Sequence, residues 1–426
     1  PTRECHLPQH RLWALLREAV VAQPQNPLLE DYRANLHDGP QGVEVNLTSA
    51  DGKEVQRLRC RYAVCADGAH GAGRQALGIG RVKGAGPGQH LINVHFFSPE
   101  LSELLGRRIL AGIYFIYAAS GVGILVSHEV KRGEFVLQLP YFPPHQRTGD
   151  FTKPICAQLI EQLAGAPLAV EIGSVRPWRT GDWMAKRFHS NSGRCFIVGD
   201  AAHQFLPTGG FGLNCGIADA HNLAWKLALV LRDGDGGGNR GEALLNTYTT
   251  ERRSAADGYL ALSRSNFKKT MAVASALGLD WQAARWLDML VHLLPAPGFV
   301  GRRLFGLGLR LALGQVDLLR SDNLVGRARR RQLKRLFEDP DRNLGMRFPG
   351  QDLGVSYPNG WLEETADRAE APTGGGDYEA TLTNGGRLPH FLLLPMAPEE
   401  KSPISALDLP GRVSAQGTTP VHLLLL

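Results

Sequence analysis

The chain has 426 residues, 43% of them hydrophobic and 21% charged, which is the composition of a globular protein with room for two or three domains. Its net charge of +6 does not select a partner, because a basic surface attracts dinucleotides, membranes and nucleic acids alike, and we expect no nucleic-acid role from charge alone. Six cysteines without a CxxC pair argue against a zinc site or a disulfide framework. We therefore expect no metal site, and reduced thiols in an intracellular protein, cytoplasmic or organellar.

The first part of the chain predicts one helix and then many strands. Apolar residues near one face predict a helix over 7–22, and alternation predicts a strand over 43–47, a turn at Asp51-Gly52 and one or two strands over 55–64. After a glycine-rich segment, residues 90–140 alternate as strands. Residues 109–126 carry no charge and reach the length of a membrane-spanning helix, but their glycines and β-branched residues favour two strands joined by a turn. No transmembrane segment is expected.

The second part predicts helices around one short buried strand. We expect a helix over 151–164, strands over 172–175 and 195–198, and a helix from about residue 217 to residue 231. A flexible loop is expected over 233–241, and a helical pattern covers 242–337 with breaks at Pro295 and Pro297. Beyond Pro340 the sequence is rich in loop residues.

The strongest motif is the run of 36 residues from Gly193 to Ala228, which predicts a strand, a carboxylate, a glycine loop and a helix. Asp200 follows the strand at its carboxyl end, where open α/β sheets bind ligands, and a carboxylate there accepts hydrogen bonds from sugar or polyol hydroxyls. Gly209, Gly210 and Gly212 permit a close approach of the backbone. The helix that follows offers unpaired N–H groups to negative charge. The alternative is a structural strand–loop–helix with a capping Asp.

This run resembles the second FAD-binding motif of the group A flavin monooxygenases, the para-hydroxybenzoate hydroxylase-like family. The resemblance implies that Asp200, after Gly199, binds the ribityl chain of FAD and that Pro207 lies beside the reactive face of the flavin ring. It implies that the backbone amides of Leu213 and Asn214 contact the N1–O2 edge of the ring. No acid–base residue is assigned, and His203, close to Asp200, is interpreted as packing at the helix entry rather than as a proton relay.

Two further segments resemble the same family. Residues 62–74 are similar to its Asp-Gly motif, which serves FAD and the nicotinamide cofactor; this implies that Asp67, with Gly68, holds the FAD ribose region and that Arg74 supports the dinucleotide. The commoner family sequence has Ser at Gly71, and the pair alone would be read as a turn. Gln9 resembles a helix-entry glutamine that contacts FAD, although a surface glutamine fits equally well.

Other matches organise the rest of the chain. Tyr248, Glu251 and Arg252 match a Tyr-x-x-Glu-Arg segment with a structural role on a helix behind the flavin site. Residues 386–390 and 405–409 resemble the opening of the thioredoxin-like domain of the phenol hydroxylase branch. Residues 71–76 fit GxGxxA only superficially, because they follow the Asp-Gly pair rather than a strand. The strand–GxGxxG–helix unit that opens family members is expected before residue 1, so the chain is interpreted as a fragment.

The expected fold is α/β: an incomplete Rossmann-like three-layer FAD-binding domain with a mostly antiparallel sheet domain for substrate, a helical region and a truncated thioredoxin-like segment. The expected domains are 1–88 for the first FAD-binding segment and 89–180 for the substrate-binding sheet. Residues 181–340 form the second FAD-binding segment with the helical region, and 341–426 form the linker and thioredoxin-like start. Tyr114, Tyr117, His95 and His128 in the sheet are conceivable substrate contacts, and packing is the simpler reading of each.

The resemblance implies an FAD- and NAD(P)H-dependent monooxygenase. NAD(P)H would reduce FAD, molecular oxygen would add at flavin C4a, and the resulting hydroperoxide would hydroxylate a small aromatic substrate with a phenolic or quinone-like ring. One alternative is an FAD oxidoreductase of the same fold that does not insert oxygen. Another is a non-catalytic protein that retains the fold as a scaffold. The oligomeric state is left open, and a homodimer is compatible with the sequence.

Overall fold

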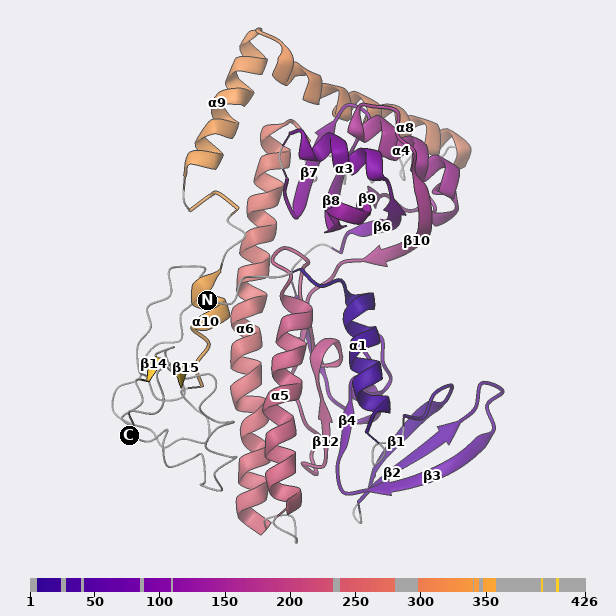
Figure 1. Cartoon of the computed structure of the whole chain (residues 1–426), viewed down its shortest axis with the longest axis vertical. Coiled ribbons are helices and arrows are strands. Elements are labelled where there is room, and N and C mark those ends of the chain that lie inside the picture. The colour runs from indigo at the N-terminus through magenta and orange to yellow at the C-terminus, as the bar shows by residue number, and fades with distance from the viewer. Residues whose placement is uncertain are drawn as a thin grey trace.

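The computed structural model describes residues 6–23, 28–39, 42–84, 88–108, 110–232, 238–279, 298–339, 341–344, 348–357, 392–393 and 404–405. The fold is α/β, with an antiparallel sheet on one side and a small parallel sheet between helices on the other (Figure 1). A long helix, α6 (Gly238–Ala276), runs alongside both parts.

The larger sheet has the strand order β10-β6-β9-β8-β7, and all its neighbouring strands are antiparallel. Its strands are β6 (His90–Phe97), β7 (Ile113–Ala118), β8 (Gly121–Glu129), β9 (Glu134–Tyr141) and β10 (Glu171–Arg179). Within the uncharged stretch, residues 113–118 and 121–126 pair as the β7–β8 hairpin, as the composition predicted. Pro177 lies in β10, where the missing N–H is tolerated because β10 is an edge strand.

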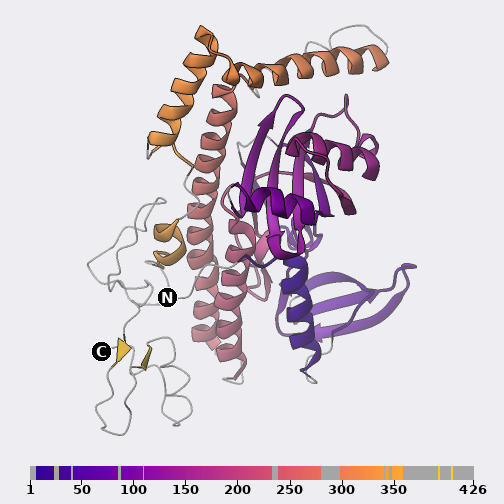
Figure 2. The ribbon, with the colours of Figure 1, turned by 45° about the horizontal axis from the view of Figure 1, so that its top comes forward.

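Helices α3 (Pro99–Gly106) and α4 (Lys153–Ala164) cover one face of this sheet (Figure 2). Phe96, Phe135 and Leu137 point into that face and are buried with Cys156 and Ile160 of α4. Because side chains alternate along a strand, His95, Val136 and Gln138 project from the opposite face. This second face is only partly covered, so the sheet has one side available for other contacts.

The smaller sheet pairs β4 (Ala63–Cys65) with β12 (Cys195–Ile197) in parallel, although the paired residues Ile197 and Cys65 are 132 positions apart in the sequence. All three residues of β12 are buried, as a strand between covering layers requires. Helices α5 (Phe211–Arg232) and α6 pack side by side against it, and α1 (Gln9–Val21) lies on its other side (Figure 1).

The remaining strands and helices surround these two sheets. β1 (Arg33–Gly39), β2 (Gly42–Thr48) and β3 (Glu54–Cys60) form an antiparallel meander, and β11 (Trp183–Ala185) pairs with both β5 (Arg81–Lys83) and β13 (His203–Gln204). Helices α8 (Gly298–Gly314), α9 (Leu324–Glu338) and α10 (Pro349–Leu353) follow α6. The short helix α2 (Gly73–Ala76) has four residues, and β14 (Leu392–Leu393) pairs with β15 (Ile404–Ser405).

The structure corrects one element that bears on the site. The helix expected from about residue 217 begins at Phe211, so Gly212, Leu213 and Asn214 lie in its first turn rather than in a glycine loop. Gly216 is suited to its place in this helix, since a Cβ there would lie 3.2 Å from the Cα of Gly199. Among the described helices, none has the length and apolar character needed to cross a membrane. The thioredoxin-like matches over 386–390 and 405–409 lie, apart from Ser405, outside the described residues.

Candidate functional site

The site is built at the carboxyl end of the parallel pair β4–β12. Pairing of Ile197 with Cys65, extended by a hydrogen bond from Val198 N–H to the Cys65 carbonyl (3.1 Å), carries both chains out of the sheet at the same edge. The turn after β12 contains Asp200, and the turn after β4 contains Asp67. Two carboxylates that are distant in sequence are thus brought to one edge, which is where α/β sheets bind ligands.

Asp200 lies in a 3-10 turn (Gly199–Ala201) and its side chain is exposed. Gly199 adopts φ +57°, a left-handed conformation that glycine accepts without strain. The surrounding protein raises the pKa of Asp200 by desolvation, and the charge of His203 acts in the opposite direction. The carboxylate is exposed at this edge of the sheet, where it can accept hydrogen bonds from hydroxyl donors.

The glycine loop after β13 is fastened to α6. Gly209 (φ +133°) and Gly210 (φ +67°) take conformations that other residues rarely adopt. The Thr208 hydroxyl donates to the Ser263 carbonyl (2.7 Å), and the Asn266 side-chain amide donates to the Thr208 carbonyl (3.2 Å). Pro207, the preceding residue, is consequently held in a fixed place. Sequence reasoning did not identify Ser263 or Asn266, because nothing in a helical pattern marks which polar residue turns towards a loop.

The first turn of α5 presents its backbone to the same site. A Cβ at Gly212 would lie 3.8 Å from Asp200 Oδ1, so the helix start and the carboxylate are neighbours. The Asn214 side chain donates to the Gly210 carbonyl (3.2 Å), and the Leu213 side chain is 45% exposed. The N–H groups of a first helical turn have no partner inside the helix, and the helix dipole makes this end positive. An anionic or electron-rich edge would be stabilised here.

A buried charge network lies directly behind this turn. Asp219 of α5 accepts hydrogen bonds from Gly199 N–H (3.1 Å), from His203 Nε2 (2.6 Å) and from Arg252 Nε (2.7 Å). Burial alone would lower the pKa of His203, but its hydrogen bonds to Asp219 and Cys215 raise that pKa to about 10. Burial alone would raise the pKa of Asp219, and His203 and Arg252 lower it. His203 is therefore a buried cation that fixes the turn, in line with its interpretation as packing rather than as a relay.

The Tyr-x-x-Glu-Arg segment supplies the second layer of this network. Tyr248 O–H donates to the Ile197 carbonyl at the end of β12 (3.0 Å), and Arg252 donates to the Tyr357 hydroxyl (2.6 Å). Glu251 accepts from Lys226 of α5 (2.7 Å), and the Lys226 side chain is fully buried. The predicted structural role of this segment behind the site is confirmed.

The Asp67 side chain is hydrogen-bonded within its own turn. Asp67 Oδ2 accepts a hydrogen bond from Gly73 N–H (2.7 Å), and Gly68 adopts φ +79°. A Cβ at Gly71 would lie 2.0 Å from Asp67 Cγ, so the Ser common in the family would require this carboxylate to move. Arg74 is buried, donates to the Ile79 carbonyl (2.6 Å) and lies over the Trp183 ring. These contacts hold Arg74 against the turn and the neighbouring strand.

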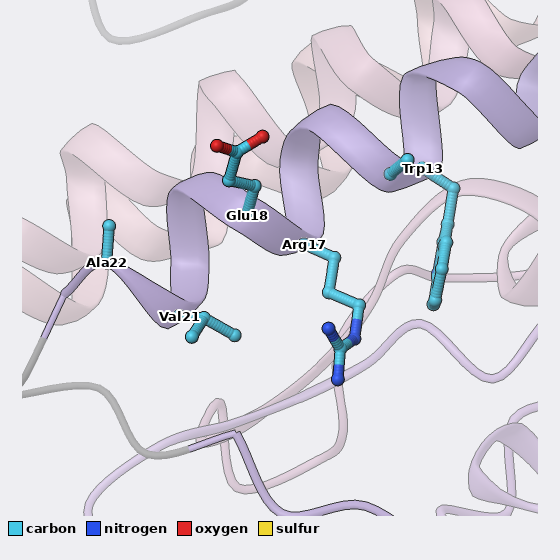
Figure 3. Close-up of a pocket in the computed structure, with 6 residues that line it drawn as sticks. Trp13, Arg17, Glu18, Val21 and Ala22 are labelled. Atoms are coloured by element: carbon cyan, nitrogen blue, oxygen red, sulfur yellow. The ribbon is translucent and has the colours of Figure 1, made fainter.

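Helix α1 contributes Gln9 and an uncovered apolar strip. Gln9 is the first residue of the helix and is exposed. A hollow of about 430 Å³ lies farther along the helix, lined by Trp13, Ala14, Arg17, Glu18, Val21 and Ala22 (Figure 3). Trp13 is 62% exposed and Arg17 binds Glu30 (2.8 Å) rather than the site. The residues that line this hollow all belong to 13–22, and they include neither Asp200 nor the glycine loop.

These residues fit a flavin dinucleotide. Asp200 offers a carboxylate to polyol hydroxyls, and the start of α5 offers N–H groups to an electron-rich ring edge. Leu213 and Ile217 are 45% and 50% exposed on the same helix and offer apolar surface to a ring system. The site thus combines a strand, a turn with a carboxylate and the start of a helix, with a buried ionic network behind them. This arrangement defines a cofactor-binding domain of the dinucleotide-binding α/β class.

Comparison with known proteins identifies the family. Residues 1–263 match the family model described as an FAD binding domain, and the chain belongs to this family. The tetracenomycin A2 monooxygenase-dioxygenase of Streptomyces glaucescens is 36% identical over 267 residues, which cover 59% of this chain and 45% of that protein. The chain spans less than half the length of the first curated relatives that it matches.

Solved structures agree with this assignment. The flavin-dependent monooxygenase PieE, in complex with FAD and substrate, superposes with a TM-score of 0.71 at 26% identity, over 94% of this chain and 64% of PieE. The rebeccamycin biosynthetic enzyme RebC with reduced flavin gives a TM-score of 0.66 at 26% identity, over 94% of this chain and 63% of RebC. The α/β fold and the family predicted from the sequence are confirmed.

Proposed function

We propose that the protein to which this chain belongs is an FAD- and NAD(P)H-dependent monooxygenase that hydroxylates a phenolic or quinone-like ring. The observation that carries the proposal is the arrangement of Asp200, the glycine loop and the first turn of α5 at one sheet edge. The family supports the cofactor. The relatives whose names include hydroxylase or monooxygenase support the reaction class.

In this proposal the residues of the chain position FAD and shield it. Asp200, after Gly199, accepts hydrogen bonds from the ribityl chain, and the amides of Leu213 and Asn214 stabilise the pyrimidine edge of the flavin. Pro207 lies beside the ring because Gly209 and Gly210 turn the chain there. Bound FAD supplies the redox chemistry and the activation of oxygen. The protein contributes orientation, electrostatics and the exclusion of water.

Roles at the second carboxylate are also proposals. Asp67 and Gly68 would lie at the FAD ribose after Asp67 exchanges its hydrogen bond with Gly73 for one to the cofactor or to water. Gln9 would contact FAD from the start of α1. Arg74, which donates to the Ile79 carbonyl, would support the dinucleotide from this turn.

The open face of the five-stranded sheet is the proposed wall of the substrate site. His95, Val136 and Gln138 project from the face that α3 and α4 leave uncovered. The proposed division remains 1–88 and 181–340 for the two FAD-binding segments, 89–180 for the substrate-binding sheet and 341–426 for the thioredoxin-like start.

Flavin titration tests the cofactor site. FAD added to the purified full chain should lose fluorescence saturably, and Asp200→Asn should weaken binding about 10- to 100-fold, the loss expected for hydrogen bonds to a charged group. Asp322→Asn is the matched control, because the Asp322 side chain is 94% exposed on a remote turn. Equal affinity of the Asp200 and Asp322 variants for FAD would refute the assigned role of Asp200. If the unaltered chain took up no FAD, the alternative of a non-catalytic protein that retains the fold as a scaffold would be favoured.

Turnover tests the reaction class. A FAD-loaded chain that oxidises NADH or NADPH faster with a phenolic substrate, and that transfers labelled oxygen from O2 to the product, behaves as a monooxygenase. Substrate-dependent oxidation without label in the product would identify an oxidoreductase of the same fold instead.

A further inference from the structure

Three histidine side chains gather around one buried carboxylate on the open face of the sheet, at the start of α1. Glu134 of β9 is 3% exposed, and its Oε1 atom lies 3.0 Å from His95 Nε2, 3.4 Å from His10 Nε2 and 3.8 Å from His128 Nδ1. His95 and His128 come from β6 and β8, and His10 comes from α1. The cluster therefore joins the helix to the sheet. The spacing of these residues in the sequence does not predict that they meet.

The two oxygens of Glu134 have different partners. Oε2 accepts a close hydrogen bond from Arg11 Nη2, and Arg11 Nη1 also binds Glu129 (2.6 Å). Oε1 is left to the histidines. Arg11 therefore fixes the orientation of the carboxylate through one oxygen only.

The nitrogen of His128 that faces Glu134 has no hydrogen-bond partner. Its Nδ1 atom is buried, and the 3.8 Å to Oε1 exceeds a hydrogen bond. Buried polar atoms nearly always have a partner, and imidazole nitrogens are common metal ligands, so a bound ion would supply the partner that this nitrogen lacks.

The separations match those around a tetrahedral ion. Ligand atoms about 2.0–2.1 Å from Zn²⁺ lie roughly 3.3 Å from one another. The ligand atoms of His10, His128 and Glu134 all lie within 4.8 Å of one another, and the two Oε1–nitrogen distances are 3.4 and 3.8 Å. Small side-chain rotations would bring the three atoms into contact with one ion. The His10 side chain is 55% exposed, which leaves an open approach from solvent.

We propose that His10, His128 and Glu134 bind one divalent transition-metal ion of the Zn²⁺ type, with a fourth position open to water. Two imidazoles and a carboxylate favour such ions over Mg²⁺ or Ca²⁺, which prefer oxygen ligands. His95 and Arg11 take the place of outer partners, because they bind the ligating carboxylate without being required as ligands. The ion would fasten the start of α1 to the sheet.

A second group with metal-binding side chains serves as an internal comparison. His203, Cys215 and Asp219 are fully buried, and both oxygens of Asp219 already bind cations, Arg252 and His203. The His203 nitrogen that faces Asp219 is already engaged in a hydrogen bond with it (2.6 Å). This group is a structural ion network, and we do not propose a metal there.

Cobalt titration of the metal-stripped full chain tests the proposal. Co²⁺ should bind with a stoichiometry of one, produce visible absorption typical of nitrogen and oxygen ligands, and be displaced by Zn²⁺. His10→Ala should weaken binding more than the roughly 10- to 100-fold expected for the loss of an outer partner. This variant should fold normally because His10 is exposed. His37→Ala, at an exposed histidine of β1, is the matched control and should bind like the unaltered chain.

A thermal-unfolding readout accompanies the titration. Zn²⁺ should raise the Tm of the unaltered chain and of H37A, because a ligand that binds only the folded state stabilises it, and should not raise the Tm of H10A. Absence of a saturable site in the unaltered chain would overturn the proposal, as would unchanged affinity in H10A. A thiolate-to-cobalt band in the near ultraviolet would also overturn it, because the proposed site contains no cysteine and the ion would have to lie elsewhere.

Discussion

Asp219→Asn tests whether the buried ionic network holds the proposed flavin site together. The substitution keeps the shape of the side chain and removes the negative charge that pairs with both Arg252 and His203. Arg252 and Asp219 are 1% and 0% exposed, so the guanidinium would remain buried without its counter-ion. Removal of one partner of a buried pair costs about 3–5 kcal/mol.

A carboxylate-to-amide change at an exposed ion pair on the next helix is the control for the loss of stability. Asp257 pairs with Arg253 one turn away on α6 at 3.7 Å, and the two side chains are 51% and 37% exposed. Exposed pairs of this kind contribute about 0–1 kcal/mol. Asp257→Asn should therefore leave the free energy of unfolding nearly unchanged, while Asp219→Asn should lower it by several kcal/mol.

Urea unfolding followed by circular dichroism measures both variants under the same conditions. A double variant that also carries Arg252→Met should recover part of the loss, because it no longer buries an unpaired cation. If Asp219→Asn costs less than about 1 kcal/mol, or if the double variant is as unstable as the sum of the single changes, the network does not act as described.

Three other predictions follow from backbone strain, proton linkage and thiol burial. Gly133→Ala should destabilise the chain by at least about 2 kcal/mol more than Gly165→Ala in urea unfolding. The two glycines have similar φ angles of +67° and +70°, but a Cβ at Gly133 would lie 2.7 Å from backbone atoms, whereas a Cβ at Gly165 would meet nothing within 4 Å. Equal losses of stability in the two variants would contradict this prediction. Because the pKa of His203 is raised to about 10, its contribution to stability is fully present below its unfolded pKa of about 6.5 and is lost as pH rises towards 10. Unfolding measured between about pH 6.5 and 8 should show this slope, and His203→Gln should flatten it. Burial raises the pKa of Cys195 to about 12, so a thiol reagent at pH 8 should label Cys195 only after unfolding, and rapid labelling in the native chain would refute its burial.

The local elements of the site were predictable because their signals are local. A buried strand, a carboxylate and three closely spaced glycines gave the order of β12, the Asp200 turn and α5. The start of α5 was misplaced by six residues, because glycines usually end helices. At Gly216 the absence of a side chain instead permits contact with Gly199.

Two strands were missed for different reasons. β1 contains Asn, Asp and Gly, which disfavour strands, and it exists because every residue from Arg33 to Gly39 pairs with β2. β11 has three residues and pairs with β5, about one hundred positions earlier in the chain. Patterns read within a short window contain no information about such partners.

The sequence by itself determined the family, the α/β class and the residues at the ends of β4 and β12, because motif spacing and strand alternation are properties of consecutive residues. Only the tertiary structure decided which charges are buried. Asp219 and Arg252 are 33 residues apart, and Glu134 meets His10 from another element altogether. A charged side chain is stable in the interior only beside its partners, and folding alone determines which residues those partners are.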